Sequence, residues 1–261
     1  MTHTPFVMRS DTAGVSTLTL NRPESRNALS LGMLLALSAE LDRIAVDPSV
    51  RVVVIAGAGP AFCAGHDLKE IRAEKFGSVY SKKLFAECAK MMLAVVRLPK
   101  PVIAQVHGIA TAAGCQLVAS CDLAVAADDA RFATPGVNIG LFCSTPMVAL
   151  SRNVGRKAAM RMLLTGDPID AETATRFGLI NEVVPAAELA TRTAALAAKI
   201  AAKSALTLAI GKEAFYRQAE LALSEAYAYA AKVMVTNLGK RDAQEGIEAF
   251  IEKRPAVWCG Q

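Results

Sequence analysis

Two stretches of the chain combine an apolar run, a turn of small residues and the expected start of a helix. The first extends from Val52 to Lys69 and the second from Pro101 to Gln116. The first turn of a helix carries backbone N–H groups that lack an intrahelical partner, at the positive end of the helix dipole. Small residues let a ligand oxygen approach such groups closely, and two converging donors would form an oxyanion hole. Tight packing of strand against helix is the alternative reason for the small residues.

A few side chains with suitable chemistry lie in or near these stretches. His66 would titrate near neutral pH, and Asp67 follows it where a helix is expected to begin, a position that suits a capping carboxylate. His107 stands at the end of an expected strand, and we predict a structural role for it. A nucleophilic Cys143 would need a basic partner, and the sequence places none beside it.

Alternating strands and helices are the elements that must position these residues. The β-branched run Val52–Ala56 predicts a strand buried on both faces, and three further runs also predict strands: Val15–Leu20, Val102–Val106 and Leu123–Ala127. Helices are expected between them, and helical patterns dominate from Thr145 onward. Strand–helix alternation followed by a helical tail predicts an α/β fold, with a core over residues 1–190 and a helical C-terminal region over 191–261.

Composition excludes several classes of protein. The 261 residues are 53% hydrophobic and 20% charged, which excludes a disordered chain. Polar residues interrupt the long apolar region 102–127, so we predict no membrane span. The net charge of +5 comes from scattered basic residues, which predicts no nucleic-acid partner. Six cysteines without metal-type spacing predict reduced thiols and no metal site, and an N-terminus without a signal pattern predicts a cytoplasmic location.

Several motifs together resemble the crotonase superfamily, the enoyl-CoA hydratase/isomerase family, over nearly the whole chain. The motifs are Asn21–Leu29 (NRPESRNAL), Ala61–Lys69 (AFCAGHDLK), Lys100–Gly108 (KPVIAQVHG), Ala113–Leu117 (AGCQL) and Glu245–Pro255 (EGIEAFIEKRP). The stretch Ala113–Ser144 is most similar to one subgroup of that superfamily. The resemblance implies a spiral core of ββα turns and a helical C-terminal region that builds a homotrimer or a dimer of trimers.

The resemblance also implies a ligand and the residues that hold it. Members of the family bind acyl-CoA thioesters, in which CoA is part of the substrate, and no separate cofactor is implied. The thioester oxygen lies between two backbone N–H groups, which match His66 and Ala113. Other matching positions imply contacts with CoA, the last two often made to a neighbouring subunit: Arg26, Ala28, Ala64, His66, Leu68, Phe250 and Lys253.

The chain departs from the hydratases of the family at both catalytic glutamates, which match Gln116 and Gly136. Glutamine can orient water but cannot take its proton, and glycine offers no side chain. Each lost acid or base typically costs about 10²–10⁴ in rate, so we expect poor hydratase activity. His66, where the family usually has a small residue, is the candidate to replace them.

Two hypotheses remain. The chain is an acyl-CoA enzyme whose chemistry does not need the glutamates, such as isomerisation, decarboxylation of a malonyl-type thioester or thioester hydrolysis. The alternative is a non-catalytic acyl-CoA-binding protein.

Overall fold

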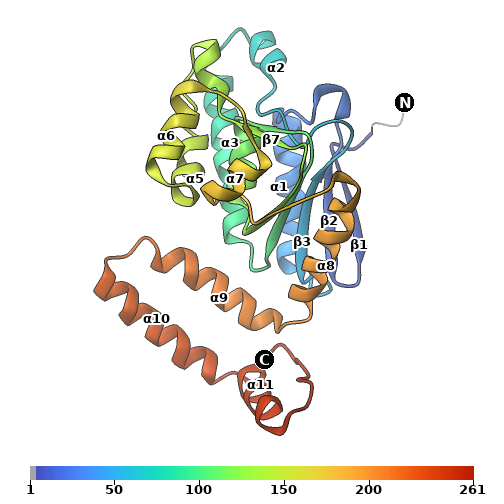
Figure 1. Ribbon diagram of the computed structural model, residues 1–261, viewed down its shortest axis with the longest axis vertical. Helices are drawn as coiled ribbons and strands as arrows, with labels where there is room; N and C mark the ends of the chain where they lie inside the picture. Colours follow the sequence, from blue (N-terminus) through green and yellow to red (C-terminus); the bar gives the residue numbers. More distant parts are fainter. Residues whose placement is uncertain (1–3) are drawn as a thin grey trace.

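A six-stranded sheet forms the centre of the molecule in the computed structural model, which describes residues 4–261 (Figure 1). Its strand order is β1-β2-β3-β4-β6-β9. The first two strands pair antiparallel and all the others parallel. The strands are β1 (Val7–Thr12), β2 (Val15–Leu20), β3 (Val52–Gly57), β4 (Val102–Val106), β6 (Leu123–Ala127) and β9 (Glu182–Val184). A parallel sheet needs cover on both faces, and helices provide it.

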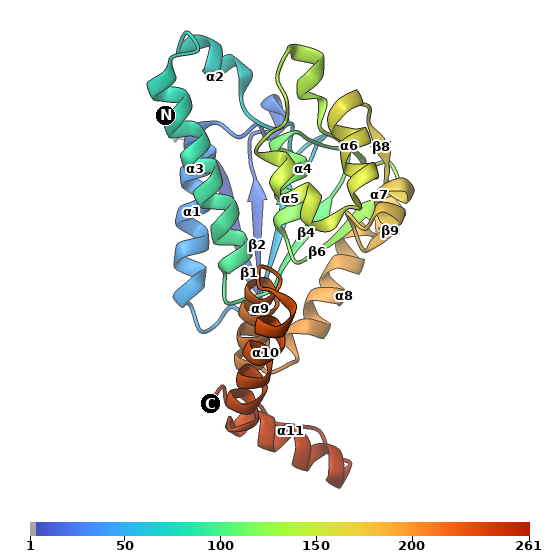
Figure 2. The same cartoon turned by 90° about the vertical axis from the view of Figure 1, so that its left-hand side faces the viewer.

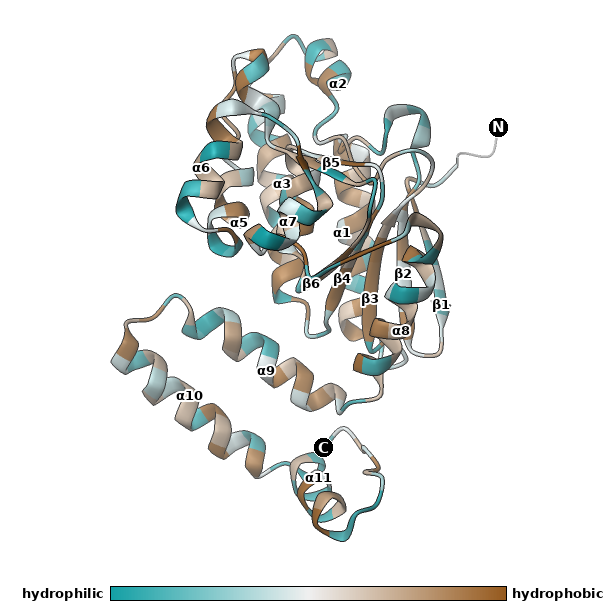
Figure 3. Ribbon diagram, viewed as in Figure 1, coloured by the Kyte–Doolittle hydropathy of each residue, from teal (hydrophilic) through white to brown (hydrophobic). Residues whose placement is uncertain are grey.

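Strand β3 shows how the sequence pattern produces this layering. Val53 and Ile55 pack into the larger core, beneath α1 (Leu31–Val46) and α3 (Ser78–Arg97). Val52 and Val54 point to the opposite face and pack against α8 (Leu189–Ala201). The prediction of a strand buried on both faces is therefore confirmed, and the hydropathy colouring shows the same apolar centre (Figure 3).

A small second sheet and several short helices lie beside the large sheet. The small sheet has the order β5-β7-β8. Its strands are β5 (Ile109–Thr111), β7 (Arg131–Ala133) and β8 (Ile169–Asp170). The short helices are α2 (Leu68–Ala73), α4 (Ala113–Ser120), α5 (Pro146–Asn153), α6 (Arg156–Thr165) and α7 (Ala171–Phe177). Three 3₁₀ turns complete the core: η1 (Pro23–Ser25) after β2, η2 (Pro135–Ile139) after β7 and η3 (Ala186–Glu188) before α8.

Three helices form an arm that extends below the core (Figures 1 and 2). They are α9 (Ala205–Gln218), α10 (Leu223–Leu238) and α11 (Arg241–Glu252). The helix before them, α8, packs on the sheet and shares its core. The predicted division of the chain at residue 190 stays a prediction. Helix α8 begins at Leu189 and packs on the sheet, so by its packing this helix belongs to the core. Helix α10 leaves apolar side chains exposed, among them Leu223, Tyr227, Met234 and Val235.

A buried ion pair attaches the arm to the core. The ammonium of Lys212 on α9 donates to Asp122 Oδ2 at 2.7 Å and to the carbonyl oxygens of Val95 and Lys100 at 3.0 Å each. The hydroxyl of Tyr216, one turn further along α9, donates to Asp122 Oδ1 at 2.9 Å. All three ammonium protons and both carboxylate oxygens are thus engaged, so we call this group the arm clamp. A pocket of about 320 Å³ lies beside it between α9 and the core.

The C-terminal tail folds back onto the arm. Asp242, near the start of α11, accepts hydrogen bonds from the backbone N–H groups of Cys259 and Gly260. The indole N–H of Trp258 donates to the carbonyl oxygen of Ala202 at 2.9 Å. These bonds fix α11 relative to the end of α8.

No single helix in residues 4–261 has the length and apolarity to cross a membrane, although one bent pair of helices, 186–201 with 205–218, meets that test on length and composition together. The same residues hold no group of three His, Cys, Asp or Glu side chains suited to a metal ion. Five of the six cysteines are buried, and Cys259 is exposed.

Candidate active site

The first candidate oxyanion donor, the backbone N–H of His66, is directed by a short parallel pairing with Leu29. Leu29 N–H donates to Gly65 O at 2.7 Å, and Asp67 N–H donates to Leu29 O at 3.4 Å. In a parallel pairing of this kind, the residue between the two bonded neighbours directs its own N–H to the other side. His66 therefore presents its N–H away from Leu29.

The second candidate donor, the backbone N–H of Ala113, begins helix α4. The first N–H of a helix has no partner within it. The preceding Ala112 has φ +50°, an uncommon conformation for a residue other than glycine, and its N–H donates to Ala133 O. A Cβ placed on Gly65 would lie 3.3 Å from Ala113 N. The segments that carry the two donors are thus in contact, as an oxyanion hole requires.

The small residues of this turn also serve packing. A Cβ on Gly114 would lie 2.2 Å from the carbonyl oxygen of Cys63, so only glycine lets the first turn of α4 lie against the segment before His66. The packing reason considered for the small residues is therefore confirmed at Gly114, and the approach of a ligand oxygen stays a prediction.

Five positions that resemblance assigns to CoA contact lie on two neighbouring segments. Ala64 N–H donates to Arg26 O at 3.0 Å, and the pairing of Leu29 with His66 continues this contact. Ala28 is buried, whereas Leu68, the first residue of α2, is exposed. The structure thus places Arg26, Ala28, Ala64, His66 and Leu68 on two paired segments, of which the second approaches Ala113 at Gly65.

Phe250 and Lys253 are not part of this cluster within one chain. Both lie at the C-terminal end of α11, at the far end of the arm from α2 (Figure 1). The Phe250 side chain is 85% exposed. One copy of the chain therefore does not bring these two residues to its own candidate site.

The imidazole of His66 is held in a largely apolar environment. Its Nδ1 lies 3.3 Å from Leu29 O, and its ring packs edge-on against Phe85 with 5.2 Å between ring centroids. Burial lowers the pKa of His66 below its ordinary value of 6.5, against smaller opposing effects from the Leu29 hydrogen bond and Glu70. At pH 7 the ring is therefore neutral.

Gln116 and Gly136, which occupy the positions of the family's two glutamates, have different surroundings. Gln116 lies on α4, 6% exposed, and its Oε1 has no hydrogen-bond partner in residues 4–261. Gly136 N–H donates to Cys143 Sγ at 3.3 Å, and Leu141 N–H donates to Gly136 O. A Cβ on Gly136 would lie 2.5 Å from Leu141 O, so the loop 136–143 closes on itself where a side chain would stand.

The other candidate side chains have structural partners. Asp67 caps α2 by accepting from Lys69 N–H and Glu70 N–H, as expected. His107 Nε2 lies 2.8 Å from Gly59 O, in agreement with a structural role. Burial raises the pKa of the Cys143 thiol, which opposes formation of a nucleophilic thiolate.

Sequence reasoning missed the side chains that surround His66. Glu70 accepts a hydrogen bond from Leu31 N–H at 3.0 Å, and Tyr80, on the next helix, has its pKa raised by burial and then by Glu70. Phe85 provides the ring contact with His66. Only the packing of α2 and α3 brings these residues together, and no motif in the sequence marks them.

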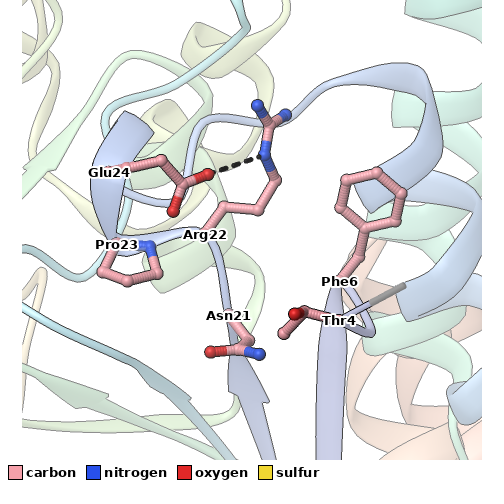
Figure 4. A pocket seen from close by; sticks show the side chains of 6 residues that line it. All are labelled: Thr4, Phe6, Asn21, Arg22, Pro23 and Glu24. Atoms are coloured by element: carbon pink, nitrogen blue, oxygen red, sulfur yellow. Dashed lines mark hydrogen bonds and ion pairs between the residues drawn. The ribbon is translucent and has the colours of Figure 1, made fainter. Parts of the chain in front are cut away.

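A surface pocket of about 500 Å³ lies at the ends of β1 and β2, apart from the candidate oxyanion donors (Figure 4). Arg22 stands in it between Glu24 and the ring of Phe6. The same guanidinium also reaches Asp67 at 3.4 Å. Arg22 therefore links the loop before Arg26 to the cap of α2.

Comparisons with known proteins agree with this geometry. The family model described as enoyl-CoA hydratase/isomerase matches residues 10–261. Mitochondrial enoyl-CoA hydratase domain-containing protein 3 is 50% identical over 98% of this chain in Xenopus laevis (87% of the relative) and 50% identical over 94% in Homo sapiens (80% of the relative). The stretch Ala113–Ser144 suggested the subgroup to which these relatives belong, so they confirm the predicted subgroup.

Solved structures confirm the predicted fold. An enoyl-CoA hydratase structure from Mycobacterium smegmatis superposes with a TM-score of 0.95 at 56% identity, covering 98% of this chain and 99% of that one. The human enoyl-CoA hydratase domain-containing protein 3 structure gives 0.94 at 48%, covering 97% and 100%.

The prediction of a cytoplasmic location is wrong on this comparison, because the relatives about 50% identical to the chain are named as mitochondrial proteins. The N-terminal pattern used for that prediction carried too little information. The family itself is established by the match over residues 10–261 together with these relatives: this chain belongs to the enoyl-CoA hydratase/isomerase family.

Proposed function

We propose that this chain binds acyl-CoA thioesters and acts on them by stabilising an oxyanion between the backbone N–H groups of His66 and Ala113. The observation that carries the proposal is the contact between the two segments, with one N–H directed away from Leu29 and the other at the start of α4. Proteins of this family bind acyl-CoA and commonly oligomerise. Such a donor is typically worth about 10²–10³ in rate.

CoA would extend from this point along the segments of Arg26 and Ala64. The arm would carry Phe250 and Lys253 to the site of a neighbouring copy, because both lie far from the site of their own chain. The exposed apolar side chains of α10 support assembly, since a soluble monomer seldom leaves a large apolar face uncovered. A homotrimer or a dimer of trimers is the assembly we propose.

The chemistry would not follow the usual two-glutamate hydration. Gln116 can orient a water but cannot take its proton, and the Gly136 loop is closed against a side chain. His66 is neutral and lies at the donor position, so it is the proposed base. Enolate-forming steps that need one base, such as isomerisation, fit this set of residues.

A non-catalytic acyl-CoA-binding protein is the second candidate. It is favoured by one observation, the absence of a carboxylate at both Gln116 and Gly136. A turnover screen across enoyl-, malonyl- and saturated acyl-CoA thioesters, run beside calorimetric binding, separates the two. Binding without turnover of any thioester would support this candidate over the enzyme.

Removing one backbone donor tests the oxyanion hole itself. Ala113 is the first residue of α4, a position that tolerates proline, which has no N–H. Ala113→Pro should lower turnover by about 10²–10³, or weaken thioester binding if there is no turnover, in a variant that keeps its circular dichroism spectrum.

The matched control is Arg156→Pro, the same kind of change at the first position of α6, outside the site. Full thioester binding and turnover by folded Ala113→Pro would remove Ala113 from the hole.

A further inference from the structure

Two buried polar atoms beside the candidate oxyanion donors have no hydrogen-bond partner among residues 4–261. They are Nε2 of His66 and Oε1 of Gln116. His66 also carries the first donor on its backbone, and Gln116 lies one turn after the second donor on α4. Buried polar atoms are nearly always paired, because burying one without a partner costs about 1–3 kcal/mol. Two such atoms, one on the residue of the first donor and one on the helix of the second, therefore point to a ligand that pairs with them.

The hydrogen-bond role of His66 Nε2 follows from the other ring nitrogen. A carbonyl oxygen can only accept, so the contact between Nδ1 and Leu29 O places the proton of the neutral ring on Nδ1. Nε2 then carries a lone pair and can only accept. Phe85, which packs against the ring, offers no donor to it, and Glu70 on α2, as a carboxylate, only accepts. The hydroxyl of Tyr80 on α3 is itself buried without a hydrogen-bond partner among residues 4–261, so it does not pair with Nε2 either.

We propose that His66 Nε2 selects acyl groups that carry a hydrogen-bond donor, such as a hydroxyl, near the thioester. The inference rests on the proposed function, since it places the acyl group beside the two backbone donors. Gln116 assists from α4, because its amide can present either its oxygen or its NH₂ group. His66 would thus use its backbone for the thioester oxygen and its side chain for the acyl substituent.

The same argument works against one class of substrate. A carboxylate on the acyl group, as in malonyl- or succinyl-CoA, brings only acceptors toward His66 Nε2 and the neighbouring Glu70 carboxylate. Because none of these groups has a proton to donate, the carboxylate of the acyl group and His66 Nε2 would both remain without a hydrogen bond. Of the reactions considered for this chain, decarboxylation of a malonyl-type thioester therefore fits these side chains least well.

Calorimetric binding of matched thioesters tests the proposal. The probes are butyryl-CoA, its 2-, 3- and 4-hydroxy derivatives, and succinyl-CoA. One net hydrogen bond corresponds to about a tenfold change in affinity. We expect at least one hydroxybutyryl-CoA to bind about tenfold more tightly than butyryl-CoA, and succinyl-CoA to bind more weakly than both. In His66→Phe, which keeps an aromatic ring beside Phe85 and the backbone N–H, the ratio of hydroxybutyryl-CoA to butyryl-CoA affinity should fall to about one.

His107→Phe is the matched control, because His107 also bonds to a backbone carbonyl but lies outside the site. It should keep the wild-type ratio. Equal affinity of the wild type for butyryl-CoA and all three hydroxy derivatives, or an unchanged ratio in His66→Phe, would overturn the assignment of His66. Failure to bind any acyl-CoA would instead overturn the proposed function, so the two failures are distinguishable.

Discussion

Replacing Lys212 by methionine should destabilise the chain strongly, because it removes the cation from the arm clamp. The Lys212 side chain is 8% exposed and that of Asp122 17%. Methionine keeps a chain of similar length and apolar character but cannot donate. The change leaves the Asp122 carboxylate with two donors, Val102 N–H and Tyr216 O–H. The carbonyl oxygens of Val95 and Lys100 lose theirs.

The size of the effect follows from these contacts. Removing one partner of a buried ion pair typically costs 3–5 kcal/mol, because the other charge is left uncompensated. Asp122 retains some solvent contact and two donors, so we expect the lower end, about 3 kcal/mol. That corresponds to a factor of about 10² in the unfolding equilibrium constant. Urea unfolding at one fixed protein concentration measures it, since assembly would also shift the midpoint.

A double variant separates the charge from the packing. Lys212→Met combined with Asp122→Asn removes both charges, so it should lose less than the sum of the two single variants. A loss below about 1 kcal/mol for Lys212→Met, which is typical of an exposed pair, would refute the argument. Strict additivity in the double variant would refute it as well.

Four further outcomes are expected. In steady-state assays, the wild-type chain should hydrate crotonyl-CoA several powers of ten more slowly than a family hydratase does, because it lacks two acid/base groups worth about 10²–10⁴ each in rate. Gln116→Glu should restore part of that rate. Gly136→Ala should lower the free energy of unfolding by about 1–3 kcal/mol in urea titrations, since its Cβ would lie 2.5 Å from Leu141 O. Burial lowers the pKa of His66 below 6.5, so the unfolded chain binds a proton that the folded chain does not, and stability should fall as pH drops below 6.5. His66→Phe should flatten that part of a pH series of unfolding. Lys253→Ala should weaken CoA binding in low salt and have less effect in high salt, as calorimetry at two ionic strengths would show.

The long periodic elements could be predicted from the sequence, and the short ones could not. In the apolar run Val52–Ala56 and in the apolar stripe of α1, the spacing of apolar residues along the sequence already indicates which side chains are buried. Strand β1 has one buried residue, Val7, and pairs at a sheet edge, while β5, β7 and β8 are too short to show a period.

The candidate site divides in the same way. Motif positions predicted two donors and the segments for CoA contact, and the fold brings those segments into contact with each other and with the start of α4. The sequence shows that Gly136 has no side chain but not why one would not fit there, and a positive φ is not the reason, because Gly136 is absent from the positive-φ glycines. Contact with Leu141 O is the actual constraint. The environment of His66 depends on Phe85 and Glu70, which approach it only through packing.

Helix α4 has a consequence beyond the site at its first turn. It begins at Ala113 and ends two residues before Asp122, the core residue of the arm clamp. Its eight residues span about 12 Å, and its interior hydrogen bonds make it stiff along its axis. Because the helix joins the arm clamp to the proposed oxyanion donor, we expect a shift of α9 at Asp122 to move Ala113 as well. Substitutions in the arm should then alter the geometry of the proposed donor, and in the proposed assembly, dilution that separates the copies should change affinity for thioesters as well.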